Sequence, residues 1–384
     1  MSSAIVFYIS GHGFGHAARM IEVINAIFAK RPETRIGVRT AAPRWLFDAS
    51  VKGRISYSHL EADTGIVQID SLTLDEADSV RRAAAFHADM VSRAASETRT
   101  LRESDAGLVV GDIPPLASSV GAAAGIPTVA IGNFTWDWIY SDYPRTRLAP
   151  NLLPSVRQAY AKTYMALRLP MWGGFQHIGN VKDIPFIARH ATKTPKEVCK
   201  ALKLPSGKPI VLLSFGAYGL PSLDVDALGK SKKYTFVTTA NVPLGRRKEI
   251  EERKGSFITL DEQAIYDAGV RYEDLVATAD AVVTKPGYGI ISECIANDTA
   301  ILHTPRGHFP EYDVLLREMP KLVRQASIDH ETLFSGKWET HLDKLLAQPK
   351  IKKKPETNGA DVAAEILLHT LDNPPKRARR PKKK

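Results

Sequence analysis

The stretch Ser10-Gly11-His12-Gly13-Phe14-Gly15-His16 joins two segments of different hydrophobic periodicity. It follows Ile5-Val-Phe-Tyr-Ile9, a continuous apolar run typical of a strand buried on both faces. It precedes residues 17–30, in which apolar side chains recur at helical spacing. The glycines therefore lie at a strand-to-helix turn, where missing side chains let a ligand approach the backbone. The helix offers unpaired N–H groups and its positive dipole end to an anion.

The two imidazoles of this turn favour a reaction over a plain nucleotide cradle, because imidazole exchanges a proton near neutral pH. The main alternative is the dinucleotide fingerprint G-x-G-x-x-G. Gly11 and Gly13 fit it, but His16 occupies the third position, where close packing of helix on sheet needs a small residue. The second strand leads into Thr40-Ala-Ala-Pro43, without the acid that would hold a ribose. We therefore expect no NAD site.

Length and composition favour two ordinary globular domains. The chain has 384 residues, of which 44% are hydrophobic and 24% charged. No apolar run approaches the ~20 residues that cross a bilayer, and we expect no signal peptide. The two cysteines, Cys199 and Cys294, lie far apart and match no metal-binding spacing. We expect a reduced, cytoplasmic protein with no transmembrane segment.

The net charge of +10 is concentrated near one end of the sequence. Residues 350–384 carry +7, which leaves +3 for the rest of the chain. Residues 373–384 are predicted to form a disordered basic tail. This tail either solubilises the protein or is weakly attracted to an anionic lipid surface or nucleic acid. We expect no specific nucleic-acid partner, and the oligomeric state stays open.

Strand-like runs alternate with helical segments, which is the pattern of a parallel sheet covered by helices. Each half of the chain has a glycine turn after its first strand. We predict an α/β protein with two Rossmann-like, doubly wound domains facing across a cleft, over residues 1–185 and 186–355. A helix over residues 356–372 is expected to pack back on the first domain. The predicted elements are strands at Ile5–Ile9, Ile36–Thr40, Ser56–Leu60, Gly107–Val110, Thr128–Ile131, 209–214, Thr235–Thr239, Ser256–Thr259, Ala281–Thr284 and Ala300–His303, and a helix at Leu152–Leu167.

Candidate site residues follow the strands of the first half. Asp112 ends a buried strand, so it is expected at the sheet edge that also carries the Gly11–His16 turn. It either orients His16 or caps the next helix. The aromatic segment Asn133–Tyr143 suits a polyhydroxyl ligand, and it equally suits packing under a loop. The residues expected to contact such a hydroxyl-bearing ligand, called the acceptor below, are His12, Phe14, Asn133, Trp136 and Asp137.

In the second half, Lys285-Pro-Gly-Tyr-Gly289 follows a strand and opens a helix whose N–H groups are suited to a diphosphate. Glu293 lies one turn further on, where it either accepts ribose hydroxyls or is an acid favoured by the helix dipole. Asp224 and Asp226 form a D-x-D pattern, but in a polar segment away from the strand ends. We expect them on the solvated surface, and we expect no metal site.

Together these motifs resemble the glycosyltransferase-like half of plant L-arabinokinase and its stand-alone bacterial relatives. The resemblance runs to about Leu371 and does not include the kinase half of the plant enzyme, so no sugar-kinase activity is expected. More distantly, the layout is similar to nucleotide-sugar glycosyltransferases of the GT-B fold. The matching motifs are Gly11–His16, Asp112, Asn133–Asp137, Asp183–Pro185, Ser214–Gly216, Lys285–Glu293 and Pro305–Glu311.

The resemblance implies an enzyme that moves a hexosyl or related sugar from a nucleoside-diphosphate sugar, with UDP favoured, to an acceptor hydroxyl. It implies metal-independent inversion, no bound cofactor, and His16 as a base supported by Asp112. Two alternatives stay open: a sugar-nucleotide epimerase, which needs no acceptor, and a regulatory protein that binds a nucleotide sugar without chemistry. The expected donor-binding residues are Phe215, Gly216, Ala217, Lys285, Gly287, Tyr288, Gly289, Ser292, Glu293, Arg306 and Glu311.

Overall fold

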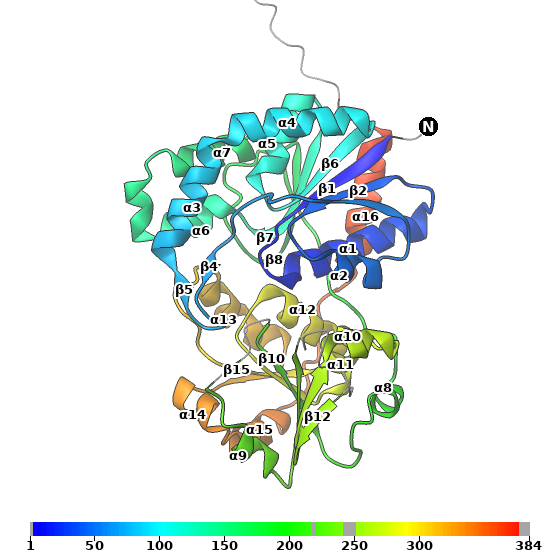
Figure 1. Cartoon of the computed structure of the whole chain (residues 1–384), viewed down its shortest axis with the longest axis vertical. Coiled ribbons are helices and arrows are strands. Elements are labelled where there is room, and N and C mark those ends of the chain that lie inside the picture. The colour runs from blue at the N-terminus through cyan, green and yellow to red at the C-terminus, as the bar shows by residue number, and fades with distance from the viewer. Residues whose placement is uncertain (1–2, 217–219, 221, 241–250, 376–384) are drawn as a thin grey trace, which may run out of the picture. The chain divides into compact units, whose positions relative to one another are not determined.

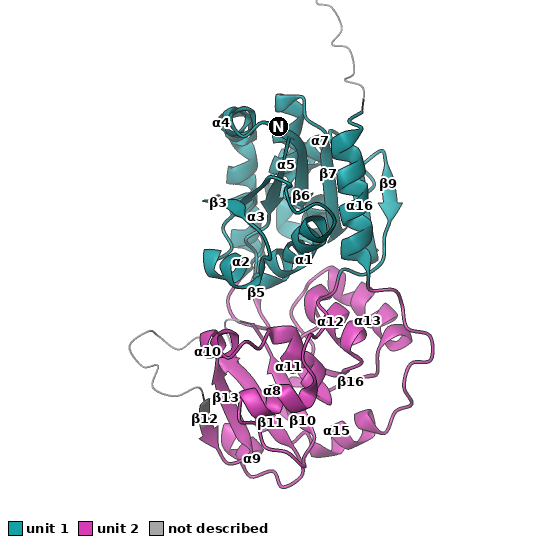
Figure 2. Ribbon diagram, turned by 90° about the vertical axis from the view of Figure 1, so that its right-hand side faces the viewer, with its two compact units in different colours: residues 1–67, 75–187, 358–384 teal, residues 68–74, 188–357 magenta. Residues whose placement is uncertain are grey.

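The computed structural model describes the chain except for residues 1–2, 217–219, 221, 241–250 and 376–384, and Figure 1 labels its elements. The chain forms two compact units, coloured separately in Figure 2. Unit 1 holds residues 1–67, 75–187 and 358–384, and unit 2 holds residues 68–74 and 188–357. Each unit contains a seven-stranded sheet with helices, so the predicted α/β class is confirmed.

The sheet of unit 1 has the strand order β3-β2-β1-β6-β7-β8-β9, and every neighbouring pair is parallel. The strand order reverses between β1 and β6, and ligands of such sheets bind beside the carboxyl ends at this point. Its strands are β1 (Ala4–Ile9), β2 (Ile36–Thr40), β3 (Ile55–His59), β6 (Ala106–Asp112), β7 (Thr128–Phe134), β8 (Met165–Gly173) and β9 (Val181–Asp183). Its helices are α1 (Phe14–Lys30), α2 (Arg44–Ser50), α3 (Glu76–Ala88), α4 (Met90–Glu103), α5 (Pro115–Ala124), α6 (Trp136–Asp142), α7 (Leu152–Tyr160) and α16 (Gly359–Asp372), with a 3-10 turn at Pro144–Leu148.

Alternate side chains of β1 enter two different cores, because successive residues of a strand point to opposite faces. Phe7 packs in one apolar cluster with residues of α1 and α16, among them Leu367. Tyr8 packs in the other with residues of α4 and α5, among them Met90 and Leu116. Helices thus cover both faces of the sheet, which explains why β1 is continuously apolar.

The helix α16 completes unit 1 although it follows the whole of unit 2 in sequence. It lies beside α1 (Figure 2), where Lys30 Nζ is 2.8 Å from Glu365 Oε1. Its first turn is tied to the segment that leaves unit 1, because the Gly359 N–H donates to the Phe186 carbonyl at 2.9 Å. Unit 1 therefore closes its core with the last described helix of the chain.

The sheet of unit 2 has the order β12-β13-β11-β10-β14-β15-β16, parallel except for the edge pair β12–β13. Leu72, from the short segment 68–74, lies in its core with Phe215 and Trp338. The strands are β10 (Ile210–Ser214), β11 (Thr235–Ala240), β12 (Glu251–Lys254), β13 (Phe257–Asp261), β14 (Ala281–Thr284), β15 (Ala300–His303) and β16 (Gln325–Ser327), and the separate strands β4 (Val67–Gln68) and β5 (Leu74–Asp75) pair with each other. The helices are α8 (Pro195–Ala201), α9 (Val225–Gly229), α10 (Glu262–Asp267), α11 (Tyr272–Thr278), α12 (Tyr288–Asn297), α13 (Glu311–Leu322), α14 (His330–Ser335) and α15 (Glu339–Leu346).

The helix predicted over Leu152–Leu167 is wrong in its second half. The helix α7 ends at Tyr160, and β8 begins at Met165 and pairs with β7, with Leu167 opposite Ile131. A short apolar run does not distinguish a buried strand from a buried helix turn, so the pattern alone extended the helix. Pro170 is compatible with β8 because β9 pairs with this strand only at residues 166–168.

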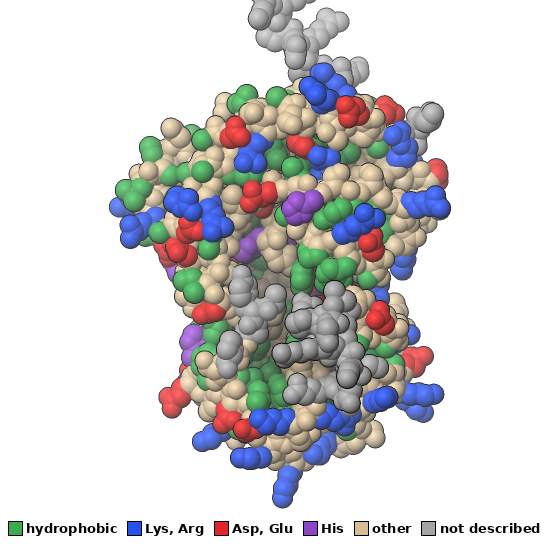
Figure 3. Space-filling model, viewed as in Figure 1, with side chains coloured by type: hydrophobic (Ala, Val, Ile, Leu, Met, Phe, Trp, Pro, Cys, Tyr) green, Lys and Arg blue, Asp and Glu red, His purple; other side chains and the backbone are tan. Residues whose placement is uncertain are grey.

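Charged side chains of both signs are interspersed on the face shown in Figure 3. This agrees with the small net charge of residues 1–349. Within the described ranges, no helix is long and apolar enough to cross a bilayer. Most of the predicted basic tail, residues 376–384, lies outside the described residues.

Candidate active site

The carboxyl ends of β1 and β6 lie side by side and bring His16 to Asp112. Ile9 pairs with Asp112 in the sheet, and Gly13 adopts a φ of +72° before α1 begins at Phe14. A positive φ suits glycine, and it lets the chain turn sharply from strand to helix. His16 Nδ1 then lies 2.9 Å from Asp112 Oδ1, and both side chains are buried. The structure thus favours the orienting position of Asp112 over a helix cap, because α5 has no side-chain cap.

Arg19, one turn after His16 on α1, binds the same carboxylate. Its Nε donates to Asp112 Oδ2 at 2.9 Å, and its Nη2 donates to Asp112 Oδ1. Its Nη1 donates to the Asn133 amide oxygen, whose Nδ2 donates in turn to the Pro170 carbonyl at 2.7 Å. Asn133 is therefore part of a fixed network and holds Arg19, a role that the sequence did not predict.

This network fixes the charge of Asp112. Burial acts to raise the pKa of Asp112, but the charges of Arg19 and His16, with hydrogen bonds from both, outweigh it and hold the pKa below its ordinary value. An ionised Asp112 favours a proton on His16 Nδ1, which leaves the lone pair on Nε2. Among the described residues, no hydrogen-bond partner is found for Nε2. The geometry suits a base that acts through Nε2.

A second buried carboxyl, Asp63, lies in the loop after β3. Its Oδ1 accepts a hydrogen bond from Ser10 Oγ and its Oδ2 accepts one from Trp136 Nε1, both at 2.9 Å. Only 6% of Asp63 is exposed. Burial raises the pKa of Asp63 to about 6, against the charge of His16 and the two hydrogen bonds, which lower it. No periodicity or motif surrounds Asp63, so the sequence did not predict it.

The residues predicted to contact an acceptor have different surroundings. Trp136 is buried, and its ring stacks on Tyr140 at 5.5 Å between centroids. The ring of His12 meets Trp136 edge-on at 6.3 Å, and Phe14 meets Trp45 in the same way at 5.9 Å. Trp136 therefore packs inside the protein, which was the alternative to ligand contact. His12 and Phe14 are half-buried, so part of each side chain is open to solvent.

Asp137 is 3% exposed and lies beside two basic side chains. Its Oδ2 is 3.6 Å from both Arg157 Nε and His177 Nε2. Its Oδ1 is buried without a hydrogen bond in the described part of the chain. No contact joins Asp137 to His16 or Asp112, so the structure places it in a separate cluster.

The predicted donor residues of unit 2 gather at the carboxyl ends of β10 and β14. Ser214 pairs with Thr284 in the sheet, and Thr284 Oγ1 donates to the Ser214 carbonyl at 2.6 Å. Phe215 and Gly216 follow the first strand, and Lys285 and Gly287 follow the second. The remaining predicted residue of the first turn, Ala217, lies outside the described residues.

Lys285 is a largely buried cation at the start of the second turn. Burial and the charge of Arg306 lower the pKa of Lys285 to about 8, against the charge of Asp70, which raises it. Within the described ranges no hydrogen bond or ion pair engages its ammonium group. Arg306 is fixed nearby by a 2.8 Å hydrogen bond from Nη1 to the Pro286 carbonyl.

The helix α12 begins at Tyr288, directly after this turn, so Tyr288 and Gly289 form its first turn. Ser292 Oγ donates to the Gly289 carbonyl at 2.8 Å and is therefore bonded within its own helix. Glu311 begins α13, with Oε1 3.8 Å from Arg306 Nη2. The structure thus connects Glu311 to the Lys285 turn through Arg306.

Glu293 has a protein partner that the sequence analysis missed. Arg189 Nε donates to Glu293 Oε1 at 2.7 Å, and Arg189 Nη1 is 3.3 Å from Glu273 Oε2. All three side chains are largely buried, at 13%, 7% and 1% exposed. The two carboxylates raise the pKa of Arg189 against the effect of burial, which lowers it. Glu293 is thus a member of a buried ion cluster, whatever else it binds.

The segment 68–74 also reaches these turns. Ser71 Oγ donates to the Phe215 carbonyl at 2.9 Å, and the Gly307 N–H donates to the Leu72 carbonyl at 2.7 Å. Asp70 accepts hydrogen bonds from the Leu72 and Thr73 N–H groups, which lower its pKa. A segment from the first half of the sequence thus supports the glycine turns of unit 2.

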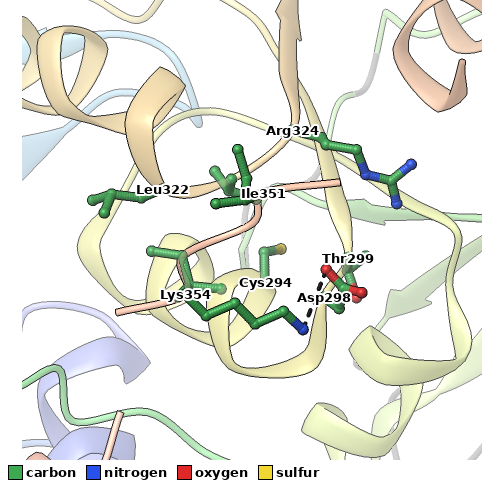
Figure 4. Close-up of a pocket in the computed structure, with 9 residues that line it drawn as sticks. Cys294, Asp298, Thr299, Leu322, Arg324, Ile351 and Lys354 are labelled. Atoms are coloured by element: carbon green, nitrogen blue, oxygen red, sulfur yellow. Dashed lines mark ion pairs between the residues drawn. The ribbon is translucent and has the colours of Figure 1, made fainter. Parts of the chain in front are cut away.

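A small pocket lies at the other end of α12, where Cys294, Asp298 and Lys354 meet (Figure 4). Lys354 Nζ is 3.5 Å from Asp298 Oδ1. The pocket volume of about 10 Å³ has room for one water molecule and not for a nucleotide. In the part of the chain that the structure describes, no three His, Cys, Asp or Glu side chains gather as metal ligands.

The chain is similar to a curated protein in sequence and to solved glycosyltransferase structures in fold. The chain is 30% identical to L-arabinokinase of Arabidopsis thaliana over 373 residues, which are 95% of this chain and 34% of that protein. The chain thus spans about a third of the length of this curated relative. A UDP-glucosyltransferase from Polygonum tinctorium, 12% identical, superposes with a TM-score of 0.59 over 97% of this chain and 95% of its own. The chain has the GT-B fold and is similar in sequence to part of L-arabinokinase.

Two further glycosyltransferase structures share this GT-B fold. The glycotransferase of kitacinnamycin is 15% identical, with a TM-score of 0.62 over 97% of this chain and all of its own. UGT2 of Phytolacca americana, solved with UDP-2-fluoro-glucose and pterostilbene, is 12% identical, with a TM-score of 0.57 over 97% of this chain and 94% of its own. No protein-family model matches the chain. The predicted resemblance and GT-B fold are confirmed.

Proposed function

We propose that this GT-B chain transfers a sugar, hexosyl or related, from a nucleoside-diphosphate sugar of the UDP type to an acceptor hydroxyl. The observation that carries the proposal is the buried contact of His16 Nδ1 with Asp112, which leaves Nε2 as a base. A protein that only binds nucleotide sugars has no need of such a base. The solved structures of the same fold are glycosyltransferases, which supports the reaction class by analogy.

In the proposed reaction, His16 Nε2 takes the proton of the acceptor hydroxyl. The electron pair of that oxygen forms a bond to the anomeric carbon, while the bond from this carbon to the diphosphate oxygen breaks. The leaving nucleoside diphosphate keeps that electron pair. The acceptor oxygen attacks from the face opposite the diphosphate in a single displacement, so the transfer as proposed inverts the anomeric carbon. The reaction as proposed uses no metal.

The leaving diphosphate is assigned to the turns of unit 2. The N–H groups of the first turn of α12, with Lys285 and Arg306, supply positive charge without reorganisation. The ribose is assigned to Glu293, whose carboxylate Arg189 holds in place. The acceptor is assigned to the side of His16, with His12 and Phe14 as contacts.

Thermal unfolding with a panel of UDP, GDP, ADP, CDP, NAD and their common sugar conjugates tests the donor assignment. A ligand at ~100 times its Kd stabilises the folded protein by roughly 2.7 kcal/mol. We expect one diphosphate family to raise the Tm by several degrees, and Glu293→Gln to abolish that shift. Glu273→Gln is the matched control, because it removes another partner of Arg189 and should keep the shift.

A shift with NAD alone would contradict the transferase proposal, and turnover of the donor without an acceptor would favour the epimerase. A shift that survives in Glu293→Gln would remove Glu293 from the donor site.

The affinity for the nucleoside diphosphate should fall as the pH rises from 7 to 9. The pKa of Lys285 is about 8, so its ammonium group is charged below this pH and neutral above it, and an anion binds the charged form. Calorimetric titration of UDP at several pH values measures the effect. In Lys285→Met the affinity should be lower and nearly independent of pH over this range. An unchanged pH dependence in that variant would exclude Lys285 from the diphosphate site.

A further inference from the structure

The site around His16 has one positive charge in excess once His16 takes a proton. Asp112 accepts hydrogen bonds from Nε and Nη2 along one edge of the Arg19 guanidinium, so this pair is already balanced as one negative and one positive charge. A proton on His16 adds a positive charge to a site that is nine-tenths buried. A buried charge without a partner is costly. Some further negative group is needed to stabilise the imidazolium.

Asp63 is built into this site by contacts to the same strand end and the same aromatic cluster. Ser10, which holds Asp63 Oδ1, also donates its backbone N–H to the Asp112 carbonyl at 2.9 Å. Trp136, which holds Asp63 Oδ2, meets Phe134 edge-on at 5.0 Å, and Phe134 meets the His16 ring in the same way at 5.9 Å. Both oxygens of Asp63 are thus positioned by residues that contact the two neighbours of His16, Asp112 and Phe134.

Two charged side chains, His16 and Asp112, act on Asp63. The positive charge of His16 favours ionised Asp63, and the negative charge of Asp112 disfavours it. Burial raises the pKa of the Tyr140 and Tyr160 phenols, and the negative charge of Asp63 raises it as well, so both stay neutral. Among these neighbours, therefore, His16 and Asp112 are the side chains whose charge acts on Asp63.

We propose that Asp63 is a positioning residue whose carboxylate balances the charge of His16 when His16 has taken the acceptor proton. Above its pKa of about 6, Asp63 is ionised. The proton that His16 takes comes from the acceptor hydroxyl, and Asp63 keeps its negative charge throughout the step. This role rests on the transfer reaction proposed above. By linkage, the free energy by which protonated His16 favours ionised Asp63 equals the free energy by which ionised Asp63 favours protonated His16.

Carbon-13 NMR of aspartate-labelled protein tests the coupling without any substrate. The Asp63 carboxyl signal, assigned from its loss in Asp63→Asn, should titrate near pH 6 in the wild type. In His16→Gln it should titrate about one unit higher, because the opposite charge is gone. Ser10→Ala removes a hydrogen bond but neither charge, so replacing His16 in that background should still move the titration. An Asp63 carboxyl that titrates at the same pH with and without His16 would overturn the proposal.

Kinetics give the second readout. Asp63→Asn, which keeps the shape of the side chain, should lower kcat about tenfold, the same factor as a coupling of one pKa unit, with the donor KM unchanged. If Ser10→Ala, which keeps both charges, also lowers kcat tenfold, the role of Asp63 is structural only. If no donor and acceptor pair is turned over, the proposed function fails, and the NMR titration still decides whether Asp63 and His16 are coupled.

Discussion

Replacing His16 by alanine should lower turnover by a factor of roughly 10² to 10⁴, the usual contribution of a positioned general base. The substitution removes Nε2 and leaves Asp112 bound to Arg19, so the buried carboxylate keeps a partner. The rate of transfer from the active donor measures the effect. The Tm shift with the nucleoside diphosphate should persist, because the proposed donor residues belong to unit 2.

His12→Ala is the matched control for this prediction, since His12 lies in the same glycine turn and its ring packs on Trp136. We expect it to raise the KM for the acceptor and to change kcat far less than His16→Ala. Turnover that survives in His16→Ala but is lost in His12→Ala would assign the base to the other imidazole of the turn.

Replacing Arg189 by methionine should destabilise unit 2 by about 3–5 kcal/mol, the typical result of removing one member of a buried ion cluster. The variant leaves the carboxylates of Glu273 and Glu293 buried without their shared cation. At roughly 2–4 °C per kcal/mol for a unit of this size, the Tm falls by about 10 °C. Differential scanning calorimetry without ligand measures it.

Adding Glu293→Gln to Arg189→Met should recover part of the lost stability, because it removes one of the two buried negative charges that Arg189 offsets. Arg168→Met is the control: its partner Asp183 is an exposed carboxylate, so the loss should stay below about 1 kcal/mol. A small loss in Arg189→Met would show that water reaches the two glutamates and that the cluster is not a structural centre.

The sequence predicted best where one physical signal acts alone. The runs at Ile5–Ile9 and Ala281–Thr284 are buried on both faces, so their apolar pattern marked strands without ambiguity. Asp112 was placed beside the first glycine turn because parallel strands share their carboxyl edge, and the structure brings it to His16. The roles assigned to these residues stay predictions.

The missed residues depend on contacts between segments that are distant in sequence. Arg19 had a local signal, since a residue three positions after His16 lies on the same helix face. Asp63 and Arg189 had none, because each lies in a loop without periodicity and its partners are brought to it only by the fold. The segment β8 was misassigned because its apolar run is as short as a helix turn.

The path of the chain limits how this protein is cut or recombined. The chain passes from one unit to the other after Val67, Leu74, Ile187 and Thr357. A break at residue 187 would leave the first piece without α16 and the second without Leu72. Chimeras that exchange one unit with a related protein should therefore carry residues 68–74 together with unit 2, and α16 together with unit 1. A chimera joined at residue 187 alone would combine side chains from two proteins within one core.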